Sequence, residues 1–185
     1  MAVRFLMIPG IGGSDAEHWQ SAWEPELGAD RIAPASWREP EESDWHDAIG
    51  ALVDSSTVLV AHSLGCLAAA SWLVRAGVGS AAGVLLVSPP DSAGPVFPAA
   101  ASSFTTPSTR LPVPSLVIAG SNDPYADQGT SARMAAAWGA PRIDVGALGH
   151  INSDSGLGRW DQGFDLLTAF VAGLGSAPGE AGREG

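Results

Sequence analysis

The chain has 185 residues, the size of one domain. It contains 9 Arg, no Lys and 20 acidic residues, so its formal net charge is −11. Such a surface repels nucleic-acid phosphates and anionic lipid headgroups, which argues against nucleic-acid binding and polybasic membrane attachment. A composition with 45% hydrophobic and 16% charged residues is typical of a packed globular protein and not of a disordered one.

The beginning of the chain is interpreted as a strand. Residues 1–8 hold a short apolar run that Pro9-Gly10 ends, too short for the hydrophobic segment of a secretory signal, so we expect a cytoplasmic protein. No apolar stretch reaches the roughly 18 residues that a membrane span needs. The single cysteine, Cys66, excludes an intramolecular disulfide and a cysteine-based metal knuckle.

Short runs of Val, Ile and Leu alternate with longer amphipathic segments, a pattern typical of a parallel sheet with helices on both faces. The sequence predicts an α/β/α sandwich around a mostly parallel sheet of about six strands. The predicted strands are Val3 to Ile8, Arg31 to Ala33, Thr57 to Ala61, Gly83 to Ser88, Ser115 to Ala119 and Arg142 to Val145.

Four helices are predicted, three between these strands and one after the last of them. Ser43 is the expected N-cap of a helix in which Trp45, Ile49, Leu52 and Val53 recur at helical spacing. The other three predicted helices are the Ala-rich Leu64 to Ala76, Pro124 to Trp138 with Pro in its first turn, and Trp160 to Leu174.

Two segments do not fit this alternation. Residues 89–114 are dense in Ser, Thr, Ala and Pro and too long for a plain connection, so we expect them to fold partly and overhang the sheet as a lid or substrate wall. Residues 175–185 consist mainly of Gly, Ala and Glu, and we expect a disordered tail. The predicted organisation is therefore one domain over residues 1–174.

The sharpest local motif surrounds Ser63. In Ala61-His62-Ser63-Leu64-Gly65, an apolar strand enters a small-x-Ser-x-Gly turn and then an Ala-rich helix, the context of a nucleophile elbow. Small residues two positions to either side avoid collisions at this turn, and the helix N-terminus favours developing negative charge. The alternative is that Ser63 only caps the helix.

A serine nucleophile needs a base, and the base needs an acid to orient it. Asp123 follows the predicted strand 115–119, and His150 follows the predicted strand 142–145, in the order Ser, Asp, His that such folds use. For Asp123, a turn or cap before Pro124 is the alternative. The joint occurrence favours a catalytic triad of Ser63, Asp123 and His150.

The other histidines fit this chemistry less well. We expect His62 to pack or bond locally, His18 to border the pocket and His46 to be structural. Because no two histidines have ligand spacing with a third donor, no metal site is expected.

An oxyanion hole requires the N–H after the nucleophile and one from the loop after the first strand, which assigns it to Leu64 and Ile11. The glycines of Pro9-Gly10-Ile11-Gly12-Gly13-Ser14 let that loop turn its amides inward. A phosphate-binding loop is rejected because the Walker lysine is absent. Gly10, Trp19 and Trp37 are the candidate substrate contacts, although core packing is an equal alternative for each Trp.

These motifs together resemble the small serine hydrolase family typified by retinoblastoma-binding protein 9 and its bacterial relatives, a branch of the α/β-hydrolases without a large cap domain. The resemblance covers most of the chain: the loop 9–14, His18-Trp19-Gln20 with Trp23, Trp37 with Pro40 and Trp45, residues 61–66, Asn122-Asp123-Pro124-Tyr125, and Gly149-His150-Ile151-Asn152 with Gly156 and Trp160. It implies a Ser-His-Asp triad and a shallow site for small acyl substrates.

The chain departs from this family at Ile11, where relatives often carry an aromatic or polar residue, and in the segment 89–114. Binding of the retinoblastoma protein is not carried over, because the residues around Cys66 lack the acidic residue of the usual binding peptide and are expected to be buried.

The sequence therefore predicts a carboxylesterase-like serine hydrolase that cleaves a small acyl ester, or a thioester or amide, without a cofactor. The alternatives are a non-catalytic binding or regulatory protein on the same scaffold, and a tailoring enzyme acting on a lactone or a carrier-bound thioester. The natural substrate, the acyl-chain preference, the oligomeric state and whether Cys66 borders the site stay open.

Overall fold

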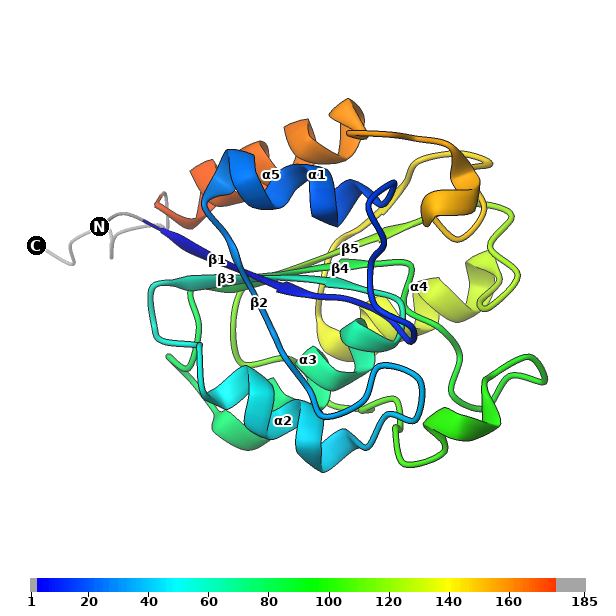
Figure 1. Cartoon of the computed structure of the whole chain (residues 1–185), viewed down its shortest axis with the longest axis horizontal. Helices are drawn as coiled ribbons and strands as arrows, with labels where there is room; N and C mark the ends of the chain where they lie inside the picture. Colours follow the sequence, from blue (N-terminus) through cyan, green and yellow to red (C-terminus); the bar gives the residue numbers. More distant parts are fainter. Residues whose placement is uncertain (1–2, 176–185) are drawn as a thin grey trace, which may run out of the picture.

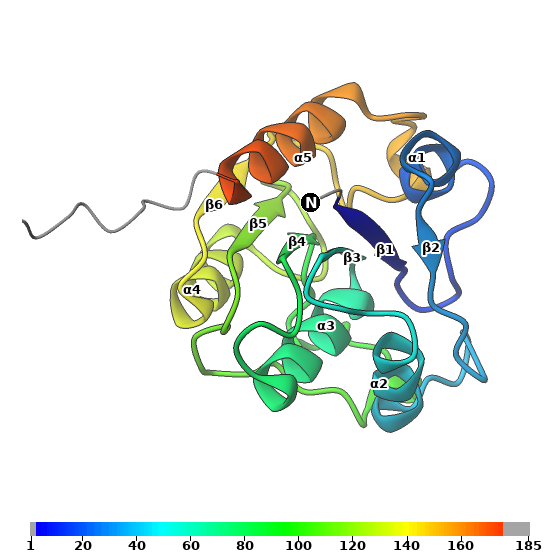
Figure 2. The ribbon, with the colours of Figure 1, turned by 90° about the vertical axis from the view of Figure 1, so that its left-hand side faces the viewer.

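In the computed structural model, residues 3–175 are described, and they form a six-stranded parallel sheet covered by helices on both faces (Figures 1 and 2). The strand order is β2-β1-β3-β4-β5-β6, and every neighbouring pair is parallel. The strands are β1 (Arg4–Ile8), β2 (Asp30–Arg31), β3 (Thr57–His62), β4 (Gly83–Val87), β5 (Ser115–Ala119) and β6 (Arg142–Asp144). This arrangement confirms the predicted fold class, including the lack of a large cap.

Alternation along the strands divides the core into two layers. In β3, Leu59 and Ala61 face one cluster of buried side chains, while Val58 and Val60 face the other. Both faces are apolar because helices cover both, as parallel sheets require.

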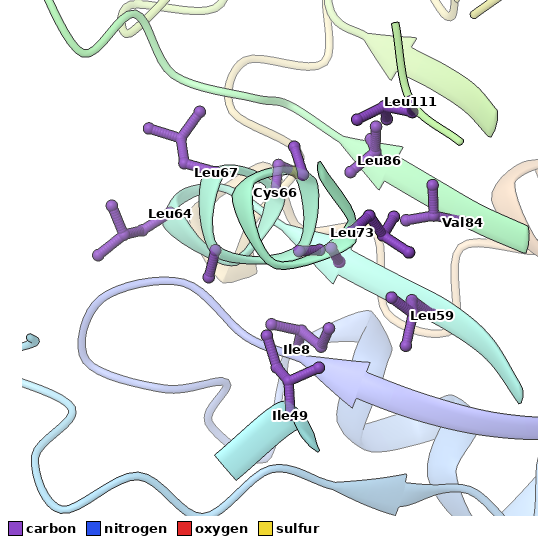
Figure 3. Close-up of a cluster of buried hydrophobic side chains, with 14 of the residues drawn as sticks. Ile8, Ile49, Leu59, Leu64, Cys66, Leu67, Leu73, Val84, Leu86 and Leu111 are labelled. Atoms are coloured by element: carbon purple, nitrogen blue, oxygen red, sulfur yellow. The ribbon is translucent and has the colours of Figure 1, made fainter. Parts of the chain in front are cut away.

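The helices lie in two groups (Figure 2). Helices α1 (Trp19–Leu27) and α5 (Asp161–Leu174) cover one face, and α2 (Glu42–Gly50), α3 (Leu64–Ala76) and α4 (Gln128–Trp138) cover the other. Helix α3 is the most deeply buried of them. Side chains from its neighbours, among them Ile8, Leu59 and Leu86, surround it (Figure 3), which explains why it is rich in alanine.

Several helix boundaries differ from the prediction. Ser43 is not the N-cap of α2, because the helix begins at Glu42 after Glu41. Helix α4 begins only at Gln128, where the Asp127 carboxylate accepts the Thr130 N–H at 2.7 Å, so Pro124 lies in the preceding loop. Side-chain capping, and not the proline, decides where this helix starts.

Helix α1 was not predicted. It is short, holds Pro25 in its interior, and ends at Gly28 in the left-handed conformation, with φ of 58°. Its core-facing side carries Trp19 and Trp23, whose indoles reach the far end of the chain and hold the helix in place. Tertiary packing therefore stabilises a helix that local propensity disfavours.

The segment 89–114 folds partly, as expected. It contains one short 3-10 helix, Ala99–Ala101, and packs Phe104 and Leu111 into the core beside α2 and α4. Of the predicted tail, only Gly175 is described, and residues 176–185 lie outside the described part of the chain.

Candidate active site

The turn between β3 and α3 places Ser63 in a strained backbone conformation. Its φ of 54° and ψ of −126° lie outside the regions that a residue with a side chain prefers. Ser63 occupies the N-cap position of α3, but its side chain makes no capping hydrogen bond. Its hydroxyl instead reaches the imidazole of His150, with 2.7 Å between Oγ and Nε2. The geometry therefore does not support capping as the role of this side chain.

Two glycines allow the chain to close around this turn. A Cβ on Gly65 would lie 2.2 Å from the carbonyl oxygen of Ile8, so α3 can meet the end of β1 only without a side chain there. A Cβ on Gly10 would lie 2.7 Å from the Ser63 Cβ and 3.2 Å from its Oγ. The loop after β1 thus runs directly against the serine.

The loops after β5 and β6 bring an acid and a base to the serine. His150 Nδ1 is 2.9 Å from each carboxylate oxygen of Asp123, and both side chains are almost fully buried. Asp123 Oδ1 also accepts the Tyr125 N–H at 2.9 Å, so the predicted turn and the contact with His150 coexist. The carboxyl ends of β3, β5 and β6 meet at one edge of the sheet because the strands are parallel.

Ser63, His150 and Asp123 consequently form one continuous chain of hydrogen bonds. With the carboxylate accepting the proton on Nδ1, Nε2 is left unprotonated and accepts from the serine hydroxyl. Such a series is able to take a proton from an attacking hydroxyl and return it to a leaving group.

A cavity of about 230 Å³ opens at Ser63. Its lining includes the apolar or aromatic residues Ile11, Leu64 and Tyr125, together with Pro90, Phe97 and Pro98 from the segment 89–114. That segment therefore forms a wall of the cavity, as expected. Its lining also includes the polar residues Asp15, His18, Asn152, Ser153 and Asp154.

The two residues assigned to the oxyanion hole both border this region. Ile11 and Leu64 line the cavity beside Ser63. The neighbouring amides of the first loop are already engaged, because the Gly12 N–H donates to the Trp37 carbonyl at 2.7 Å and the Gly13 N–H to the Gly10 carbonyl at 3.0 Å.

Neither tryptophan proposed as a substrate contact lines the cavity. Trp19 is 1% exposed, packs in the core and donates its Nε1–H to the Ile151 carbonyl at 2.8 Å. Trp37 packs against Gly13 and against the ring of Trp45. Both large rings are used to hold the loops that frame the site. Of the three predicted substrate contacts, Gly10 alone borders the cavity.

The other three histidines and Cys66 are buried or partly buried. His62 is buried and bonds the His150 carbonyl at 3.0 Å, and burial holds its pKa well below the ordinary value. His18 borders the cavity, and burial lowers its pKa to about 4. Outside the cavity, His46 bonds Ser71 at 2.8 Å, whereas the Cys66 thiol donates to the Val87 carbonyl at 3.2 Å, and burial raises its pKa.

Sequence reasoning missed Tyr125 and the run 152–154 as cavity residues, and Asn122, whose side-chain oxygen accepts the Gly149 N–H at 2.7 Å. Asn122, Tyr125 and Asn152 belong to the motifs around Asp123 and His150 that carry the family resemblance, and this was the signal that could have found them. Among residues 3–175, no three His, Cys, Asp or Glu side chains are grouped to hold a metal ion. No helix in that range is long and apolar enough to span a membrane.

Comparison with known proteins places this geometry in context. The family model described as serine hydrolase matches residues 5–169. A provisionally assigned YdeN-like hydrolase from Pectobacterium atrosepticum has 32% sequence identity and a TM-score of 0.82, with 93% of this chain and 92% of that chain covered. No curated protein matches the chain.

Two further solved structures support the fold alone. The ydeN gene product from B. subtilis has 24% identity and a TM-score of 0.80, and the match covers 92% of this chain and 100% of that one. The type II thioesterase BorB from the borrelidin biosynthetic cluster has 15% identity and a TM-score of 0.61, with 94% and 91% covered.

Proposed function

Because this chain belongs to the serine hydrolase family, we propose that it hydrolyses a small, uncharged acyl ester through an acyl-enzyme on Ser63. The observation that carries the proposal is the hydrogen-bonded series from Ser63 Oγ to His150 Nε2, at 2.7 Å, and from His150 Nδ1 to Asp123, at 2.9 Å. Each distance is within the range required for proton transfer between a nucleophile, its base and an orienting acid.

In the proposed reaction, Ser63 Oγ attacks the acyl carbon while His150 Nε2 takes the hydroxyl proton. Asp123 holds the proton on Nδ1 and stabilises the imidazolium that forms. The tetrahedral oxyanion accepts hydrogen bonds from the N–H groups of Leu64 and Ile11. When the intermediate collapses, the ester C–O bond breaks and the alcohol leaves with the proton from His150.

Deacylation repeats these steps with water. His150 takes a proton from the attacking water, the bond between the acyl carbon and Ser63 Oγ breaks, and the proton returns to the serine as the carboxylic acid departs. No redox step or external acceptor is required, so the proposed reaction needs no cofactor.

The walls of the cavity support the choice of substrate class. The ring of Phe97 and the neighbouring prolines offer an apolar surface for a short acyl group. Asp15 and Asp154, which also line the cavity, disfavour an anionic substrate. The prosthetic arm of a carrier-bound thioester contains a phosphate and is therefore disfavoured. An ester therefore fits better than the carrier-bound thioester.

Labelling with a fluorophosphonate probe tests this function. The native protein should react at Ser63, Ser63→Ala should not, and only the native protein should turn over acyl esters of graded length. Mass spectrometry during turnover should show the acyl group on the peptide that contains Ser63. A native protein that neither labels nor hydrolyses any ester in the panel would instead favour the binding protein, and a label that persists in Ser63→Ala would refute the assignment of the nucleophile.

The cytoplasmic location and the single domain over residues 1–174 stay predictions.

A further inference from the structure

Two buried side chains that take no part in the proton transfers hold the backbone of the loop that carries His150. The imidazole of His62 donates its Nε2–H to the His150 carbonyl oxygen at 3.0 Å. The indole of Trp19 donates its Nε1–H to the next carbonyl, that of Ile151, at 2.8 Å. Both donors belong to sequence motifs that the proposed reaction leaves without a role.

The loop needs such support because its conformation is unfavourable. Ile151 is a β-branched residue, yet its φ is 50°, in the left-handed region that such residues avoid. The Asn122 side chain accepts the Gly149 N–H, and the Ser155 hydroxyl donates to the Leu148 carbonyl. These bonds fix the backbone directly before His150. Within residues 3–175, the bonds from His62 and Trp19 are the ones that restrain the carbonyl of His150 and the next carbonyl, that of Ile151.

The two donors are buried. His62 is the last residue of β3 and directly precedes Ser63, and it is 4% exposed. Its bond therefore links the backbone of the base to the strand that presents the nucleophile. Because the acceptor is a carbonyl, the proton of the neutral ring lies on Nε2. Burial, with the nearby His18 and His150, disfavours a second proton on the ring.

Trp19 is anchored through its own helix. The His18 side chain caps α1 by accepting the Gln20 N–H at 3.2 Å, and the Gln20 side chain donates to the Val60 carbonyl of β3 at 3.0 Å. Both donors are thus held by β3, the strand that directly precedes Ser63. A small displacement of either would move His150 relative to the serine.

We propose that His62 and Trp19 are positioning residues that set the distance between the His150 imidazole and the Ser63 hydroxyl through two consecutive carbonyls. This inference rests on the proposed function of Ser63 and His150. A displacement of about 1 Å in a reacting group costs on the order of 100-fold in rate. Loss of one donor should therefore lower kcat and leave KM nearly unchanged.

The test uses variants that remove a donor but keep the ring. His62→Phe should lower kcat about 10- to 100-fold and Trp19→Phe about 10-fold, with KM within about 2-fold of the native value. The matched control is Trp23→Phe, which removes an equivalent indole bond from the same helix to the Arg159 carbonyl, at 2.6 Å, away from the base. It should change kcat by less than about 2-fold.

His62→Gln provides the rescue, because its amide N–H reaches about as far as imidazole Nε2; it should recover most of the kcat lost in His62→Phe. All rates are normalised to the fraction that a fluorophosphonate titrates, and thermal unfolding is followed in parallel. The inference is overturned if His62→Phe and Trp19→Phe keep native kcat per titrated site, if Trp23→Phe loses as much as Trp19→Phe, or if Gln and Phe at position 62 lose equally. Absence of labelling in the native protein would overturn the proposed function instead.

Discussion

The contact between Gly65 and the end of β1 leads to a quantitative prediction for Gly65→Ala. The new Cβ would lie 2.2 Å from the Ile8 carbonyl oxygen and 2.5 Å from that of Pro9, whereas ordinary contacts begin near 3.4 Å. The backbone would have to move by about 1 Å, because neither contact is a flexible side chain. Overpacking of this kind costs about 3 kcal/mol, and the higher helix propensity of alanine returns about 1 kcal/mol.

The expected net loss is therefore about 2 kcal/mol of unfolding free energy. For a chain of this size it corresponds to a melting temperature about 4 to 8 °C lower. Urea unfolding followed by tryptophan fluorescence measures the first quantity, and calorimetry measures the second. Activity should also fall, since α3 carries the Leu64 N–H of the proposed oxyanion hole.

The matched control is Gly173→Ala in the last turn of α5, where a Cβ meets no atom within 4 Å. Helix propensity acts alone there, and the variant should be as stable as the native protein or up to about 1 kcal/mol more stable. If Gly65→Ala were equally stable, the close approach of α3 to β1 would not be a constraint on this fold, and the reasoning would be refuted.

Three further predictions concern the site. Gly10→Ala should lower kcat by at least about 100-fold, measured per folded molecule, because the new Cβ would push the loop that carries Ile11 of the proposed oxyanion hole away from Ser63. Asp123→Asn should lower kcat by about 10⁴-fold in ester assays while the fold stays intact, since an amide that donates to His150 Nδ1 leaves the base in the wrong tautomer. The pKa of His18, about 4 in the folded protein against 6.5 unfolded, makes the unfolded state bind more protons between these values. The contribution of His18 to the unfolding free energy should therefore be constant above pH 7 and about 2 kcal/mol lower at pH 5, and the lowered pKa of His62 acts in the same direction. A flat urea-unfolding profile of the native protein over this range would contradict the assignment.

The sequence predicted the sheet well because its strands are buried on both faces and read as continuous apolar runs. The range Ser115–Ala119 was predicted without error, and the Ala-rich helix was placed at Leu64–Ala76. The predicted start of α4 was wrong because the capping side chain of Asp127 decides where this helix begins. Helix α1 was missed because the tertiary contacts of Trp19 and Trp23 stabilise it. No local pattern contains those contacts.

For the site, residue type and order along the chain were enough to select Ser63, Asp123 and His150, since parallel strands bring their carboxyl ends to one edge of the sheet. Residue type could not separate a tryptophan that binds substrate from one that packs. Trp19 and Trp37 were therefore candidates for both roles, and in the structure neither lines the cavity.

The sequence by itself determined the parallel sheet, the elbow at Ser63 and the chemical identity of the groups that meet there, because apolar periodicity and motif order are local properties of the chain. Only the tertiary structure decided which loops form the cavity and which side chains hold the base. Hydrogen bonds such as those from His62 and Trp19 join residues 88 and 132 positions apart, and their formation depends on how the whole sheet and its helices pack.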